Sequence, residues 1–560
     1  MLCIRLTQTN TMKKRHLLYS LALGTTLSLA GTAAQAQEFT RQDTLRGSIT
    51  PERAWWDLTF YDLHVSVNPQ DSSLQGSNTI RYRVLEPRQR LQVDLQPPMH
   101  IQKVTQNGKD LQVQQDGNAW FVQLQEPQKA GEEKEIKVYY GGKPQVSENP
   151  PWSGGITWER DQNGKPFIAT SVQGDGASLF WPNKDHMYDE PDSMRISVRT
   201  PEGLMDVSNG RLKNVQEHPD GSKTYTWYVS NPINNYGVNI NIGDYVHFSD
   251  KYEGEKGQLD LEYYVLRDNL GKAKEQFKQV NQMLQAFEHW FGPYPFYEDS
   301  YKLVEVPYLG MEHQSSVTYG NGYQNGYLGR DLSGTGWGKK FDFIIVHESG
   351  HEWFANNITY KDVADMWIHE SFTNYSESLF LDYHYGTEAA NEYIVGLRNI
   401  IRNDKPIIGH YGVNNSGSGD MYPKGANMLH NLRQIVGDDE KWRGILRGLN
   451  KDFYHQTVTT QQIEDYLSQK VGRDLTSVFD QYLRDVRIPK LEYKQAGRTL
   501  QYRWANSVSN FDMPVKVYLN GKEQWLEPTT EWKELKNVKR GSKVEVDKNF
   551  YVTAQRVTTA

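Results

Sequence analysis

The sequence predicts a multi-domain α+β protein with an N-terminal all-β domain, a mainly helical middle domain and a small C-terminal β-sandwich-like domain. At 560 residues the chain is too long for one compact core, so several domains are expected. Alternating apolar and polar residues predominate up to about Phe248, helical periodicity begins near Asn269, and short alternating segments return after Pro489. We therefore place the three domains at residues 37–248, 249–487 and 488–560.

The first 36 residues have the pattern of a cleavable export signal. Residues 13–15 are basic, an apolar stretch follows at 17–29, and the Ala-Gln-Ala of residues 34–36 has the small-x-small form that signal peptidase cleaves. The apolar stretch is shorter than the roughly 20 residues that span a membrane, which argues against an anchor. We expect a signal peptide over 1–36 and export to the periplasm or the outside of the cell.

The composition argues against a nucleic-acid partner and limits the choice of metal ligands. Lys and Arg number 62 and Asp and Glu number 69, which gives a formal net charge of −7. A nucleic-acid-binding protein would need a basic stripe instead. The only cysteine, Cys3, lies in the signal segment, so a metal site in the mature protein must use histidine and carboxylate ligands. We expect no membrane span after the signal segment.

Each domain has its own local pattern. In the first domain, apolar and polar residues alternate along 78–84 and 134–140, and turn-forming residues separate such segments. This pattern is typical of strands. In the third, 514–519 leads into Asn520-Gly521, a pair that favours a two-residue hairpin turn. In the second, apolar residues at helical spacing predict helices at 272–291, 341–357, 389–403, 425–436 and 460–470.

The segment His347-Glu348-Ser349-Gly350-His351 has the H-E-x-x-H pattern within a predicted helix. Side chains four residues apart on a helix share a face, so both imidazoles can bind one metal ion. Glu348 follows the first ligand and can take a proton from a water at the open side of the metal. Apolar neighbours such as Ile344 and Trp353 predict that this helix is buried.

A catalytic zinc needs a third protein ligand and leaves a position for water. Glu370 is the best candidate, because the eighteen residues between it and His351 allow a helix end, a turn and a second helix. Two alternatives are that Glu370 is a solvated helix carboxylate, and that His369 is the ligand instead. Asp365 and Asn374 flank Glu370 and are candidates to bond the far nitrogen of a ligand histidine.

These motifs resemble those of the gluzincin family of zinc metallopeptidases that contains aminopeptidase N and leukotriene hydrolase. The family has H-E-x-x-H, eighteen intervening residues and a ligand Glu in a Trp-x-x-Glu-x-Phe context, as at residues 367–372. The resemblance implies a thermolysin-like middle domain, one zinc ion and peptide substrates with a free N-terminus. Four further stretches resemble family segments in the same order along the chain: 171–173 with 181–182, 291–295 (Phe-Gly-Pro-Tyr-Pro), 310–313 (Gly-Met-Glu-His) and 422–425 (Tyr-Pro-Lys-Gly).

The resemblance also implies an anchor for the substrate's α-ammonium group. Glu312 would bind this group through its carboxylate, and Gln173 and Asp175 from the β domain would complete the pocket. His313 and Leu309 depart from the family motif, which usually has Asn and Gly there. The pocket is therefore expected to differ in shape or to titrate.

The remaining roles implied by the resemblance concern the peptide backbone and the reacting carbonyl. Gly310 and Met311 would offer backbone groups to an extended peptide that adds as a strand, next to an edge strand predicted at 301–307. Tyr422 would donate its hydroxyl to the oxyanion of the tetrahedral intermediate. Larger family members add a long helical C-terminal domain, so a more open cleft is expected here.

The sequence therefore predicts a zinc-dependent aminopeptidase with Glu348 as general base. A thermolysin-like endopeptidase is the main alternative, because it shares the zinc chemistry but needs no amine anchor such as Glu312. Epoxide hydrolysis on a lipid, known in the family, and a non-catalytic peptide-binding protein are further alternatives. A non-catalytic member would be expected to lose ligands or the base, and all are present here.

Overall fold

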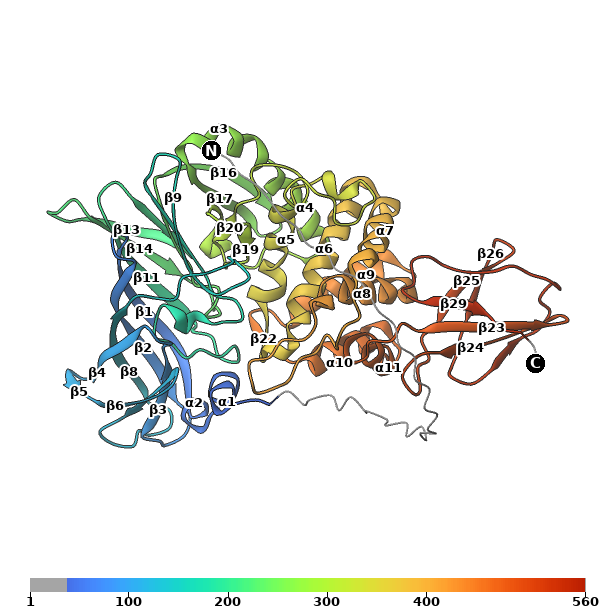
Figure 1. Ribbon diagram of the computed structural model, residues 1–560, viewed down its shortest axis with the longest axis horizontal. Coiled ribbons are helices and arrows are strands. Elements are labelled where there is room, and N and C mark those ends of the chain that lie inside the picture. Colours follow the sequence, from blue (N-terminus) through green and yellow to red (C-terminus); the bar gives the residue numbers. More distant parts are fainter. Residues whose placement is uncertain (1–37, 559–560) are drawn as a thin grey trace, which may run out of the picture. The chain divides into compact units, whose positions relative to one another are not determined.

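The computed structural model describes residues 38–558, and Figure 1 shows their helices and strands. The predicted signal peptide, 1–36, lies outside the described residues. The predicted order of a β-rich part, a helical part and C-terminal β-sheets is confirmed. Within residues 38–558, no helix combines the length and apolar character needed to cross a bilayer.

The first part of the chain is built on an eight-stranded sheet with the order β13-β14-β11-β1-β2-β8-β4-β5. Its residues follow the strand pattern, since Leu63, Val65 and Val67 are buried and the residues between them are exposed. The strands are β1 (Trp56–Asn68), β2 (Ser73–Val84), β4 (His100–Gln106), β5 (Lys109–Asp110), β8 (Glu133–Gly142), β11 (Ser193–Thr200), β13 (Arg211–Glu217) and β14 (Lys223–Val229).

Two smaller sheets and two short helices complete this part. One sheet has the order β3-β7-β6 and the other the order β12-β15-β10-β9, which leads to Gln173 just after β10. The helices are α1 (Arg41–Gly47) and α2 (Pro51–Ala54). The strands are β3 (Arg90–Asp94), β6 (Gln112–Asp116), β7 (Ala119–Gln123), β9 (Gly155–Arg160), β10 (Pro166–Ser171), β12 (Met205–Ser208) and β15 (Ile240–Gly243).

The middle part begins with a five-stranded sheet of order β16-β17-β18-β20-β19. Its strands are β16 (Tyr245–Gly254), β17 (Gly257–Leu266), β18 (Tyr301–Glu305), β19 (Gly310–Met311) and β20 (Val317–Tyr319). The predicted edge strand at 301–307 is wrong, because β18 lies between β17 and β20 and all five of its residues are buried. The edge is β19, which contains Gly310 and Met311. β16 crosses the boundary that we placed at 248/249.

Nine α-helices of the described chain belong to the middle part. They are α3 (Leu270–Gln276), α4 (Gln279–Phe291), α5 (Phe343–Gly350), α6 (Trp367–Tyr385), α7 (Thr387–Gly396), α8 (Pro423–Val436), α9 (Asp439–Asp452), α10 (Thr460–Val471) and α11 (Thr476–Phe479). A two-stranded sheet joins β21 (Ile358–Tyr360) to β22 (Gln456–Val458). The helix predicted at 272–291 is divided into α3 and α4, and the one predicted at 341–357 ends as a regular α-helix at Gly350.

The last part of the chain has a four-stranded sheet, β27-β24-β23-β29, and a three-stranded sheet, β26-β25-β28. The predicted hairpin is confirmed, because Leu519 pairs with Lys522 around Asn520 and Gly521, both with positive φ. The strands are β23 (Lys490–Ala496), β24 (Thr499–Ala505), β25 (Val515–Leu519), β26 (Lys522–Leu526), β27 (Lys533–Leu535), β28 (Val544–Val546) and β29 (Thr553–Arg556).

Shared cores fix the β-rich part against the middle part. The apolar core of the first sheets includes Val304 and Val306 around the end of β18, and Met311 of β19. Asn209 also donates its side-chain N–H to the Gln314 carbonyl at 2.8 Å. Residues near 173 and residues near 312 are therefore held against each other, although they are far apart in the sequence.

Candidate functional site

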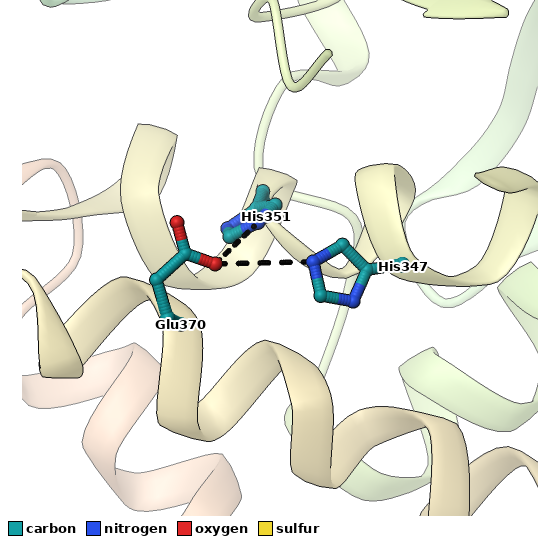
Figure 2. Close-up of side chains that lie close together, drawn as sticks. All are labelled: His347, His351 and Glu370. Carbon is teal, nitrogen blue, oxygen red and sulfur yellow. Dashed lines mark ion pairs between the residues drawn. The ribbon is translucent and has the colours of Figure 1, made fainter. Parts of the chain in front are cut away.

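The three candidate metal ligands lie on two neighbouring helices. His347 is on α5, His351 follows the end of α5, and Glu370 is in the first turn of α6 (Figure 2). Asp342 caps the start of α5, where its carboxylate accepts the N–H of Ile344 at 3.1 Å. Gly350 allows the two helices to approach, since a β-carbon there would lie 2.7 Å from the hydroxyl oxygen of Ser376 on α6.

The carboxylate of Glu370 faces both imidazoles. Its Oε2 lies 3.4 Å from Nε2 of His351 and 3.8 Å from Nε2 of His347 (Figure 2). This oxygen is buried and has no hydrogen-bond partner among the described residues. The three ligand atoms lie within 4.8 Å of one another. Two imidazoles and one carboxylate, whose buried oxygen lacks a hydrogen-bond partner, form a ligand set that fits a catalytic zinc ion.

The hydrogen bonds of the two histidines leave both Nε2 atoms free for a metal. His347 donates from Nδ1 to Oε1 of Glu377 at 2.7 Å, and His351 donates from Nδ1 to the Phe354 carbonyl at 3.0 Å. Because a carboxylate and a carbonyl oxygen can only accept these hydrogen bonds, each Nδ1 carries the hydrogen. The chain kinks at Phe354, where φ is −126° and ψ is 79°, and this kink brings the carbonyl to His351.

Glu377 was not identified from the sequence, although it lies on the same face of α6 as Glu370. It is fully buried, accepts from His347 and Asn374, and receives the hydroxyl of Tyr393 at 2.5 Å. The expectation that Asp365 or Asn374 bonds a ligand histidine is wrong. Asp365 instead accepts from Tyr411 and Thr460, and Asn374 bonds the carboxylate of Glu377 at 2.8 Å. Seven-residue spacing from Glu370 is the signal that identifies Glu377.

Replacing Glu377 with Gln is expected to weaken zinc binding about 10–100-fold, because partners that orient a ligand histidine have effects of this size. The amide keeps the shape of the side chain but removes the charge that faces His347. Zinc affinity is measured by competition with a chromogenic chelator. Glu388→Gln, at an exposed position of α7, is the control. Equal zinc affinity of the two variants would show that Glu377 does not support the site.

His369 is not placed to be a ligand, which removes that alternative. Its Nε2 accepts the N–H of Tyr360 at 3.0 Å, so Nδ1 carries the hydrogen and faces the hydroxyl of Tyr236 at 3.4 Å. Burial keeps the pKa of His369 well below its ordinary value, so the ring is neutral. Tyr236 in turn donates to Oε1 of Glu312 at 3.1 Å.

The residues predicted to bind the substrate amine lie next to the three candidate metal ligands. Gln173 donates through Nε2 to Glu312 at 2.6 Å and to Oε1 of Glu370 at 3.2 Å. Glu312 and Glu348 each have an oxygen within 4.8 Å of a nitrogen of His351. Asp175 lines the same cavity, but its carboxylate accepts the N–H of Gly154 at 2.5 Å. Its contact with a substrate amine stays a prediction.

Burial sets the ionisation of the other groups. It raises the pKa of Glu312 and raises that of Glu348 to about 7, although the facing histidines act in the opposite direction. Burial also raises the pKa of Tyr422 well above its ordinary value, and nearby Glu370 adds to this, so the hydroxyl keeps its proton. For His313, burial lowers the pKa to about 3, and the ring stays neutral at neutral pH.

For Glu370, burial alone would raise the pKa, but the charge of His351 and the two facing imidazoles lower it well below its ordinary value. The group is therefore an anion over the whole physiological range of pH. Glu370 and the other nearby carboxylates raise the pKa of His347 well above its ordinary value and that of His351 to about 9, although burial opposes this. A metal ion bound at both Nε2 atoms would displace these protons.

Two adjoining cavities form the cleft over these groups. The amine compartment, of about 380 Å³, contains Gln173, Glu312 and Glu370 in its wall. The distal compartment, of about 360 Å³, is lined largely by apolar residues such as Phe343 and Ile344. The residues that line both are Pro151, Trp152, Gly310, His347, Glu348, Gly419 and Tyr422.

Comparison with known proteins places this arrangement in a family. Residues 275–482 match the Peptidase family M1 domain, and residues 58–236 match the Peptidase M1 N-terminal domain. The chain belongs to peptidase family M1. The first match contains the three candidate metal ligands as well as Glu348 and Tyr422, and the second match contains Gln173. The predicted family, which includes aminopeptidase N, is confirmed.

Curated aminopeptidases are similar over large parts of the chain. Probable aminopeptidase 1 of Sulfurisphaera tokodaii is 23% identical over 392 residues, which cover 65% of this chain and 48% of that protein. Leucyl aminopeptidase of Saccharolobus solfataricus is 22% identical, with 63% of this chain and 46% of that protein covered. The chain thus spans about half the length of the curated relatives it matches.

A solved structure has a similar fold, and nearly the whole of that structure superposes on this chain. The M1 zinc metallopeptidase of Deinococcus radiodurans superposes with a TM-score of 0.66 and 20% identity, covering 78% of this chain and 96% of that one. At this identity the likeness concerns the fold.

Proposed function

We propose that this M1 protein is a zinc-dependent aminopeptidase that releases the first residue of peptides with a free N-terminus. The observation that carries the proposal is the position of Glu312, a buried carboxylate tied through Gln173 to the candidate ligand Glu370. A cationic amine held there lies one residue away from the bond over the ligands. The aminopeptidase names of the curated relatives support the same activity, as does a Deinococcus relative whose mutant form is bound to the substrate Tyr-Ser-Ala.

His347, His351 and Glu370 would hold a single zinc ion, which when bound polarises a water and the scissile carbonyl. Glu348 lines both compartments and takes the proton of the attacking water, then delivers it to the leaving amine. Tyr422 keeps its proton and donates a hydrogen bond to the oxyanion that forms on the substrate.

The amine compartment selects for a positive charge. Burial raises the pKa of Glu312, because the carboxylate loses hydration. A bound cation would compensate this loss and stabilise the charged carboxylate. The hydroxyl of Tyr236 and the amide of Gln173 hold this carboxylate from two sides. An N-terminal ammonium group therefore meets a preorganised acceptor, whereas a blocked N-terminus does not.

Replacing Glu312 with Gln is expected to lower kcat/KM for peptides with a free N-terminus about 10–100-fold, the range for a lost charged hydrogen bond. Slow cleavage of the matching N-acetylated peptides should not change. Release of the first residue from both peptides is followed by mass spectrometry. If the wild-type protein and the variant cleave free and blocked peptides equally fast, the protein is a thermolysin-like endopeptidase instead.

We also propose that the protein acts in the periplasm or outside the cell, on the strength of the signal pattern in residues 1–36. Processing is tested by N-terminal sequencing of the protein from the periplasm of an expressing bacterium. A chain that starts at residue 37 supports export, and an unprocessed chain retained in the cytoplasm contradicts it.

A further inference from the structure

The distal compartment lies across Glu348 from the amine-binding groups. Glu312 and Gln173 line only the amine compartment, whereas Glu348 and Tyr422 line both. If the proposed function holds, the α-amine is at Glu312 and the cleaved bond is at Glu348. The residues that follow the cleaved bond then enter the distal compartment, and this inference rests on that proposed function.

Arg402 is the one lysine or arginine among the described residues that line the distal compartment. Its backbone is fixed to the cleft, because the N–H groups of Arg402 and Asn403 donate to the carboxylate of Asp420 at 2.9 and 2.5 Å. A β-carbon at Gly419 would lie 2.8 Å from an Nη atom of Arg402. The guanidinium group therefore packs against Gly419, a residue that lines both compartments.

The guanidinium group of Arg402 is exposed and forms no hydrogen bond or ion pair with residues 38–558. Its charge contributes to lowering the pKa of nearby Asp404, which lies outside the lining of the compartment. Asp420, the acidic residue beside it, already accepts the two backbone N–H groups. Most of the remaining wall is apolar, so an anion in this compartment has Arg402 as its one cationic side chain besides the candidate ligand His347. A planar guanidinium favours carboxylates, which it can bind through two N–H groups.

We propose that Arg402 binds the carboxylate of a short peptide, so that the enzyme prefers substrates whose free C-terminus reaches the distal compartment. The two ends of such a peptide are then held by opposite charges, Glu312 for the ammonium group and Arg402 for the carboxylate. An acidic side chain after the cleaved bond offers the same chemistry as a free C-terminus, and the two sources can be distinguished.

The test compares kcat/KM for three tripeptides: Leu-Gly-Leu with a free carboxylate, its C-terminal amide, and the amide of Leu-Gly-Asp. For the wild-type enzyme, amidation of Leu-Gly-Leu should lower kcat/KM about 3–10-fold, as expected for a partly exposed charged pair. In Arg402→Gln the acid and the amide should be cleaved equally, at the rate of the wild-type enzyme on the amide. A Leu-Gly-Asp amide cleaved as fast as the free acid would assign the site to carboxylates in general.

Arg88→Gln is the matched control, because Arg88 is exposed, pairs with Glu86 and lines neither compartment. This variant should keep the wild-type preference. Equal cleavage of acid and amide by the wild-type enzyme, or an unchanged preference in Arg402→Gln, would overturn the proposal. Leucine 4-methylcoumaryl-7-amide, which has no carboxylate, should be cleaved equally by all three proteins. If the wild-type protein cleaves neither this compound nor any tripeptide, the proposed aminopeptidase function itself fails.

Discussion

Glu348→Gln is expected to bind zinc as the wild-type protein does and to lose activity about 10²–10⁴-fold, the usual contribution of a general base. Glu348 is buried at the junction of the two compartments, and its oxygen lies within 4.8 Å of a nitrogen of His351. Glutamine fills the same space but cannot take a proton from water. The loss should therefore appear in kcat, while KM changes little.

The measurement combines metal analysis with steady-state kinetics on an aminoacyl substrate. Glu348→Asp is the companion variant, since it keeps the acid but shortens its reach to the water, and its activity should lie between those of the other two proteins. Normal turnover in Glu348→Gln would remove this residue as the base. A loss of zinc together with activity would mean that the side chain supports the metal rather than the proton transfer.

The fold could be predicted because hydrophobic periodicity is a local property. Alternation in β1 and helical spacing in α8 and α10 reflect which residues face a core. The prediction failed where tertiary contacts override local pattern. β18 was expected at an edge, but neighbouring strands cover it on both sides. The helix predicted at 341–357 ends early, because the kink at Phe354 supplies a carbonyl to His351.

The ligands could be predicted because their spacing carries the geometry. His347 and His351 share a helix face, and Glu370 is placed by a family motif that the chain resembles. Glu377 was missed although its seven-residue spacing from Glu370 puts both residues on one face of α6, because that spacing does not show that the carboxylate reaches a ligand histidine. Similarly, Tyr236 is one of 34 tyrosines, and its contact with Glu312 joins residues that are 76 positions apart. Such long-range contacts follow from packing between domains.

Glu370→Gln is expected to abolish zinc binding at equimolar metal, and peptidase activity with it. Glu370 supplies the anionic oxygen of the proposed site, and that oxygen has no other partner among the described residues. The amide keeps the volume but provides no charge to balance the divalent ion, and two neutral imidazoles bind zinc much less tightly than the complete set. Zinc per chain is measured by inductively coupled plasma mass spectrometry after gel filtration.

The same variant should separate metal binding from folding. A ligand that binds only the native state stabilises it by about 4 kcal/mol at a concentration 1,000 times its Kd. Zinc should therefore raise the unfolding temperature of the chelator-treated wild-type protein and leave that of Glu370→Gln unchanged. Added zinc should restore activity to the wild-type protein alone. A Glu370→Gln protein that holds one zinc ion per chain and cleaves peptides normally would show that this carboxylate is not a ligand. The zinc site and its third ligand would then have to be sought elsewhere, and the role of Glu348 with them.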